Sequence, residues 1–152
     1  MYPGITSYRE NYVLVAAKEH GRVHLGLGFY INSDDPERDI RTLNNSTCQF
    51  WSILTALTIN KLHQLIDDAG MEKDVIITST IYDSIYLEIR DNPETIKWVN
   101  DRIVPIMEQD FMEEQIVHNS ADLEIGPDWA ELYTLPQYAS IKEIKKVRSE
   151  FG

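Results

Sequence analysis

One carboxylate stands at the bend of an otherwise apolar stretch of the chain. Asp83 interrupts the run VIITSTIYDSIYLEI, residues 75–89, which is rich in β-branched and aromatic residues on both sides of Asp83-Ser84. That pattern predicts two strands joined by a tight turn, with the carboxylate held outward at the tip. A carboxylate in this position suits a hard cation such as Mg²⁺. The alternative is an ordinary Asp-Ser turn, in which both side chains bond to local backbone.

Three polar side chains recur at a spacing of four residues. Arg41, Asn45 and Gln49 would share one face of a helix or of a near-helical turn. Arg, Asn and Gln are side chains that form hydrogen bonds to base edges and sugars in nucleic-acid complexes. The alternative is a solvated face at a helix start, with Asn45 or Ser46 as the cap.

Periodic apolar residues and turn signals predict the elements that position these side chains. Asn92-Pro93-Glu94 is typical of a helix start, and Pro105 should kink or break the helix that follows. Because hairpin-linked strands are antiparallel, we expect an α+β fold, with an antiparallel β-hairpin sheet packed on helices. The other expected elements are helices over 5–19 and from Ser46 or Thr47 to about Ala69, a hairpin over 21–32, a polar loop over 32–39 and a strand over 121–126.

Length and charge limit the function classes. The 152 residues carry 25 acidic and 14 basic side chains, so the formal net charge is −11, which argues against a free-standing nucleic-acid binder. Residues 1–65 balance at 6 acidic and 6 basic side chains, whereas residues 66–133 hold 17 and 4, which leaves room for a local DNA contact. The single cysteine, Cys48, excludes an internal disulfide and a Cys-based zinc site. No membrane-length apolar run or signal peptide is present, so we expect a soluble, cytoplasmic protein.

Taken together and in order, these pieces resemble the C-terminal palm of the family A, DNA polymerase I-like, DNA polymerases, particularly their bacteriophage members. Arg41, Asn45 and Gln49 fall on the family pattern R-x-x-x-N-x-x-x-Q, and IYDSIYLEI stands where the family has V-H-D-E-x-x-x-E-V, its motif C. The remaining matches, which extend the resemblance to about residues 2–133, are Tyr2-Pro3-Gly4-Ile5 with Tyr8 to YPGV-x-x-Y, GRVHLGLGFYI loosely to G-x-V-x-T-x-x-G-R, and GPDW to G-x-x-W.

The resemblance implies roles for particular residues. Residues 1–133 would be the C-terminal palm segment, with the motif C hairpin at 75–89, and residues 134–152 a tail that is either a short helix or frayed. Asp83 would ligate both catalytic Mg²⁺ ions. The resemblance also implies minor-groove contacts near the primer end for Arg41, Asn45 and Gln49. It implies a DNA contact for Tyr82, which stands in place of the usual His, and a structural role for Glu88. Ser84 stands where the family has a Glu.

Several parts of such an enzyme are not among these 152 residues. The motif A aspartate, the fingers helix and the thumb lie upstream of the YPG stretch in the family. We therefore expect a C-terminal fragment of a split or truncated DNA-directed DNA polymerase, which uses a DNA primer–template and a dNTP. It would need a second chain with the fingers, thumb and motif A, and would be inactive alone. The alternatives are a non-catalytic palm remnant or binding module, and an unrelated acidic α+β domain.

Overall fold

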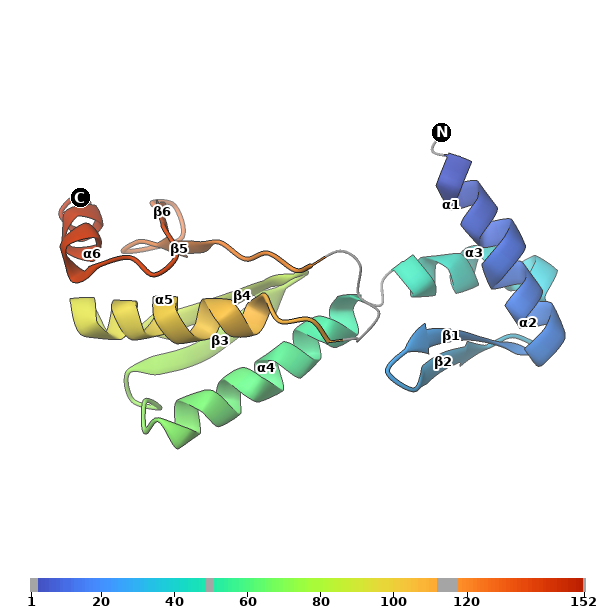
Figure 1. The fold of residues 1–152 in the computed structure, drawn as a ribbon, viewed down its shortest axis with the longest axis horizontal. Coiled ribbons are helices and arrows are strands. Elements are labelled where there is room, and N and C mark those ends of the chain that lie inside the picture. Colours follow the sequence, from blue (N-terminus) through green and yellow to red (C-terminus); the bar gives the residue numbers. More distant parts are fainter. Residues whose placement is uncertain (1–2, 49–50, 112–117, 152) are drawn as a thin grey trace. The chain divides into compact units, whose positions relative to one another are not determined.

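The computed structural model describes residues 3–48, 51–111 and 118–151. They form an α+β fold, as expected, and the strands pair in antiparallel fashion (Figure 1). The described strands form separate two-stranded ribbons, however, rather than one larger sheet. The chain divides into two compact units, Met1–Leu54 and Thr55–Gly152, and the boundary falls within helix α4 (Trp51–Asp68).

The first unit begins with an almost unbroken helix. α1 (Pro3–Tyr8), the π-helical segment η1 (Arg9–Val13) and α2 (Leu14–His20) follow one another without a gap, which confirms the helix expected over 5–19. Gly21 ends the helix with a φ of 66°, in the left-handed region that glycine enters without the steric penalty of a Cβ. The chain then turns directly into the first strand.

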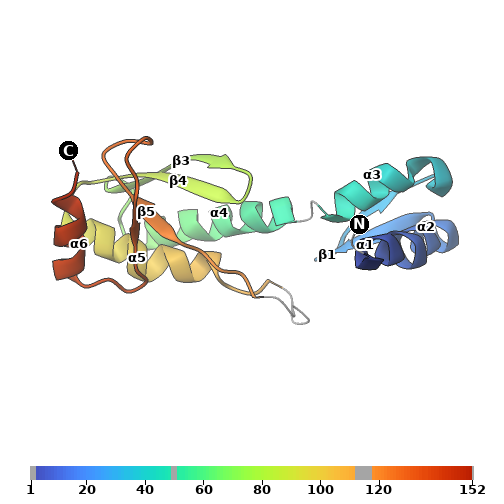
Figure 2. The same ribbon diagram turned by 90° about the horizontal axis from the view of Figure 1, so that it is seen from above.

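A hairpin and a further helix complete this unit. β1 (Arg22–Gly26) and β2 (Phe29–Asn32) form the hairpin that the sequence predicts. Helix α3 (Pro36–Cys48) follows, and Figure 2 shows it beside the hairpin and α2. A small core joins these elements and consists of buried residues from α2, η1, β1 and α3: Val13, Ala17, Val23 and Leu43.

Helix α3 corrects two expectations. The polar loop expected over 32–39 ends at Pro36, because Asp35 and Pro36 start a helix. The carboxylate of Asp35 accepts a hydrogen bond from the Arg38 N–H at 3.3 Å, and Glu37 lies in the first turn. A helix start at Ser46 or Thr47 was also wrong, since Ser46 lies near the end of α3.

The second unit is built on the hairpin of β3 (Val75–Ile81) and β4 (Ser84–Ile89), as the sequence predicts. α4 and α5 (Pro93–Met107) pack against one face of it. The Asn92 side chain caps α5 by accepting a hydrogen bond from the Thr95 N–H at 2.7 Å. The helix continues through Pro105 to Met107, so it is not broken there. The shared core contains Leu62, Ile66, Val75, Val99 and Ile103.

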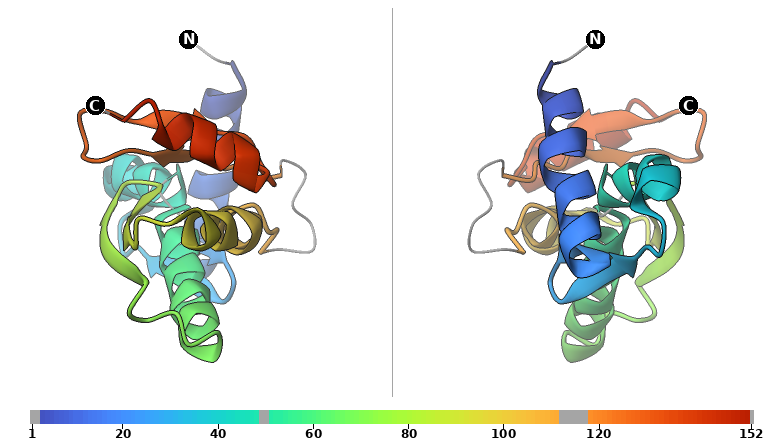
Figure 3. Two further views of the ribbon diagram at one scale, coloured as in Figure 1. Left: turned by 90° about the vertical axis from the view of Figure 1, so that its left-hand side faces the viewer. Right: turned by 90° about the vertical axis from the view of Figure 1, so that its right-hand side faces the viewer.

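The opposite side of α5 packs against the C-terminal elements. β5 (Leu123–Ile125) confirms the strand expected over 121–126, and it pairs with β6 (Tyr133–Leu135), which was not expected. The expected boundary at 133/134 falls inside β6. The tail contains a helix, α6 (Ile141–Arg148), and Figure 3 shows α5 between α4 and α6. A second core joins these elements through Ile96, Ile125, Leu135, Ala139 and Ile144.

Candidate functional site

Asp83 lies at the exposed tip of the β3–β4 hairpin. Ile81 pairs with Ser84, so Tyr82 and Asp83 alone connect the two strands. Tyr82 has a φ of 56°, in the left-handed region, and its side chain is 80% exposed. The hairpin therefore presents a carboxylate and an aromatic ring side by side at its tip, where both can meet a ligand outside the unit.

The hairpin that carries Asp83 is fixed on its inner face by the hydrophobic core. Val75 is buried, and partly buried side chains of both strands pack around it, namely Ile77, Ile85, Leu87 and Ile89. At the base of the hairpin, the Arg90 Nε lies 2.8 Å from a carboxylate oxygen of Asp74. These contacts anchor the two strands on one face and at the base, and the strands in turn position the turn that contains Asp83.

The outer face of the hairpin carries an aromatic pair that local sequence patterns did not reveal. The rings of Tyr86 and Trp129 stack with centroids 4.6 Å apart and an interplanar angle of 17°. Trp129, which follows the turn Gly126-Pro127-Asp128, is 66% exposed and rests on Tyr86. The hydroxyl of Thr78 also donates a hydrogen bond to the Tyr86 carbonyl at 3.1 Å.

Glu88, which matches the later glutamate of motif C, is exposed on the same outer face. It pairs across the hairpin with Ile76, which is also exposed. This strand position alternates with the inward-facing Leu87 and Ile89, so the Glu88 carboxylate points away from the core. Asp83 and Glu88 are thus two exposed carboxylates on one strand–turn segment.

Arg41 and Asn45 lie together on helix α3 in the first unit. They are four residues apart, so they share one face, and both are exposed. Leu43, two residues from each, points into the core on the opposite side of the helix. Gln49, the third member of the predicted trio, lies outside the described residues. Arg41 and Asn45 therefore belong to one unit and Asp83 and Tyr82 to the other.

The described part of the chain holds no preformed cluster of metal ligands. Within residues 3–48, 51–111 and 118–151, no three His, Cys, Asp or Glu side chains come together as a metal-binding group. The donor type at the hairpin tip nevertheless fits Mg²⁺, which is held through one or two carboxylates while it keeps positions for water and phosphate.

The clearest electrostatic effects belong to ion pairs and a helix cap away from the hairpin tip. A hydrogen bond from Arg148 lowers the pKa of Asp91 below its usual range, and the same contact raises the pKa of Arg148. Hydrogen bonds from Ser140 lower the pKa of Glu143 at the start of α6. Lys18 lowers the pKa of Glu37 in the first unit. These groups stabilise local structure.

Comparison of the chain with protein-family models, with curated proteins and with solved structures finds no match. None of the helices in the described ranges combines the length and the apolar character that a bilayer crossing requires.

Proposed function

We propose that this chain supplies the C-terminal palm portion of a DNA-directed DNA polymerase that resembles family A. One observation carries the proposal: Asp83 stands exposed in the two-residue turn of a hairpin whose inner face is anchored in a hydrophobic core. A catalytic metal ligand must be accessible to substrate and held in a fixed position at the same time. The exposure of Asp83 and the anchored strands on both sides of it support the proposal on these two counts.

The reaction is template-directed nucleotidyl transfer in DNA replication. The 3′-hydroxyl oxygen of the primer forms a bond to the α-phosphorus of the dNTP, the bond to the leaving pyrophosphate breaks, and the hydroxyl proton passes to solvent. Two bound Mg²⁺ ions would stabilise the charge on the attacking and the leaving oxygens. Asp83 would hold these ions together with a motif A aspartate from outside these 152 residues. The proposed reaction takes place in the cytoplasm, that of the host cell for a phage-encoded enzyme.

The proposed DNA contacts come from a row of polar side chains on α3 and from Tyr82. Arg41 and Asn45 would reach the minor groove near the primer end from α3, and Gln49 would continue the row. The minor groove presents a degenerate pattern of acceptors, so such contacts position DNA without selecting a sequence. Tyr82, beside Asp83, would contact the same primer–template.

The charge of the segment that contains Asp83 supports a need for further polypeptide that binds the DNA phosphates. Residues 66–133, which include Asp83, carry 17 acidic and 4 basic side chains. Such a surface repels DNA phosphates unless cations or a basic partner offset it. The fingers, thumb and motif A polypeptide would supply that grip and bind the incoming dNTP.

The experiment is a primer-extension assay with the purified chain, a labelled primer–template, dNTPs and Mg²⁺. The chain alone should give no extension. Addition of the polypeptide from the neighbouring reading frame, carrying motif A and the fingers, should restore it. Robust extension by the chain alone would contradict the need for a partner. A neighbouring polypeptide that carries those parts but fails to restore extension would favour the non-catalytic palm remnant.

A further inference from the structure

In the β1–β2 hairpin of the first unit, whose path Figure 1 shows, one face lies in the core and the other is exposed. Val23 and Ile31 pair across the two strands and pack in the core. Side chains alternate between the faces of a ribbon, so the neighbouring residues point outward. The exposed residues of this outer face are Arg22, His24, Tyr30 and Asn32.

Planar groups gather around Tyr30 on this face. The Arg22 Cζ lies 5.1 Å from the centre of the Tyr30 ring, in a cation–π contact. The His24 ring is tilted against the same ring at a centroid distance of 6.1 Å. Tyr30 is still 50% exposed. The contacts thus orient the ring while half of its surface stays accessible.

This hairpin is also free of acidic residues in an acidic chain. Residues 20–33 contain no Asp or Glu, although the whole chain holds 25. The acidic groups that border the segment are Glu19, which lies 3.8 Å from His20, Asp34 and Asp35, which follow it, and Asp39, whose carboxylate accepts a hydrogen bond from the Ser33 hydroxyl at 2.9 Å. Glu37 is engaged by Lys18 at 2.6 Å. A polyanion therefore meets less repulsion on this face than along residues 66–133.

From these observations we infer that the outer face of the β1–β2 hairpin binds single-stranded nucleic acid. A phosphate would pair with the Arg22 guanidinium, and an unpaired base would stack on the Tyr30 ring, since every base has a planar face that an aromatic side chain can contact. The site is distinct from Arg41 and Asn45 on α3. That the strand is the unpaired part of a primer–template rests on the proposed function, whereas the stacking and pairing do not.

The test is the anisotropy of a fluorescein-labelled oligothymidylate of about 12 nucleotides, titrated with the full chain at low salt. Tyr30→Ala should weaken binding about tenfold, and Tyr30→Phe should bind like the wild type because the ring is retained. Arg22→Ala should weaken binding and flatten its salt dependence. Arg102→Ala, which removes an exposed arginine of α5, is the charge-matched control and should change neither.

Three results would overturn the inference. The first is that the wild-type chain does not bind the oligothymidylate. The second is that wild type and Tyr30→Ala bind it with equal affinity. The third is that Tyr30→Ala loses as much affinity for a duplex of the same length, which offers no unpaired base, as it loses for the oligothymidylate. Circular dichroism should show that each variant is folded. Because the binding assay requires no catalysis, Asp83→Asn should bind the oligothymidylate like the wild type. A failed extension assay would therefore leave the binding result intact, and a failed binding assay would leave the extension result intact.

Discussion

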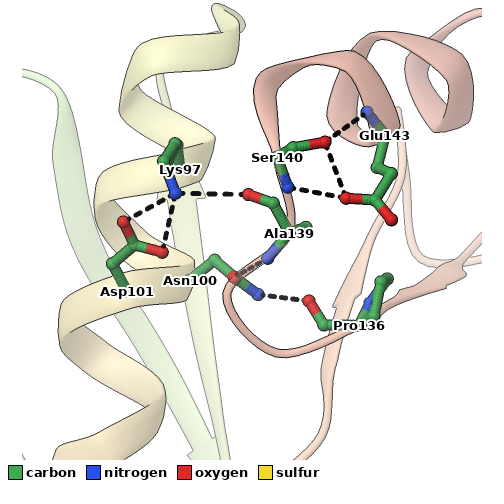
Figure 4. A network of polar contacts seen from close by, with 7 residues as sticks. All are labelled: Lys97, Asn100, Asp101, Pro136, Ala139, Ser140 and Glu143. Carbon is green, nitrogen blue, oxygen red and sulfur yellow. Dashed lines mark hydrogen bonds and ion pairs between the residues drawn. The ribbon is translucent and has the colours of Figure 1, made fainter.

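The side chain of Asn100 on α5 holds the backbone of Ala139 just before α6. Its Oδ1 accepts a hydrogen bond from the Ala139 N–H at 2.9 Å, and its Nδ2 donates one to the Pro136 carbonyl at 3.1 Å (Figure 4). Lys97, one turn earlier, donates to the Ala139 carbonyl at 3.3 Å. Asn100 is only 1% exposed. The C-terminal tail is thus an integral part of the second unit.

We expect Asn100→Leu to lower the free energy of unfolding by roughly 1–3 kcal/mol. The substitution nearly preserves volume but removes two buried side-chain hydrogen bonds, each of which contributes about 0.5–1.5 kcal/mol. The Ala139 N–H then keeps only its 3.2 Å hydrogen bond to the Pro136 carbonyl. Urea unfolding followed by circular dichroism measures the change. Asn11→Leu, at an exposed helical position, is the control and should change stability by less than about 0.5 kcal/mol. A loss below about 1 kcal/mol in Asn100→Leu would show that the bridge is dispensable.

The contact of Arg148 with Asp91 predicts a specific pH dependence. The Arg148 Nε donates to the Asp91 carboxylate at 2.7 Å and lowers its pKa from 3.8. The folded form thus has the lower pKa, so the contact stabilises the fold fully above pH 3.8, and this stabilisation is lost as pH falls through the folded pKa. Its size should stay below about 1 kcal/mol, because the Asp91 side chain is 72% exposed.

Carboxyl NMR titration of the wild type and of Arg148→Gln measures this effect. In the variant, the pKa of Asp91 should return to about 3.8. Arg102→Gln removes the same charge from an exposed site elsewhere on the second unit and should leave the Asp91 pKa unchanged. An identical Asp91 titration in wild type and Arg148→Gln would mean that the ion pair does not form in solution.

The backbone strain at Tyr82 should lower stability, whereas its exposed ring should contribute to DNA binding. A non-glycine residue in the left-handed region costs about 1–2 kcal/mol, and glycine removes that strain while it adds about 0.5–1 kcal/mol of unfolded-state entropy. We therefore expect Tyr82→Gly to raise the free energy of unfolding by about 0.5 kcal/mol. Loss of the exposed ring should weaken primer–template binding by the assembled enzyme. Urea unfolding and a DNA titration check the two effects, and unchanged DNA affinity would remove Tyr82 from the contact surface.

Local signals made much of the fold predictable. Asn92-Pro93-Glu94 predicted the start of α5, and the structure confirms it with a capping bond to Thr95. Asp35-Pro36-Glu37 is the same signal, yet Asp and Pro also favour turns, and for that reason the polar segment 32–39 predicts a loop. A cap followed by proline was the better guide in both places.

The candidate site was predictable only where its residues are neighbours in the sequence. Asp83 could be placed at a hairpin tip because the strands on both sides are local, and Arg41 and Asn45 share a face through helical spacing alone. The stack of Tyr86 on Trp129 joins residues far apart in the chain, so no periodic pattern encodes it. The three-residue strand β6 is likewise too short to stand out until β5 pairs with it.

The rate of single-nucleotide incorporation by the assembled enzyme tests most directly whether Asp83 is the metal-binding carboxylate. Asp83→Asn keeps the shape of the side chain and removes its charge, and Glu88→Gln does the same for an exposed carboxylate of β4. We predict that Asp83→Asn loses at least about a thousandfold in rate at saturating Mg²⁺, the scale expected when a group that stabilises transition-state charge is removed. Glu88→Gln should stay within about threefold of the wild type. Incorporation by Asp83→Asn at the wild-type rate would contradict the account.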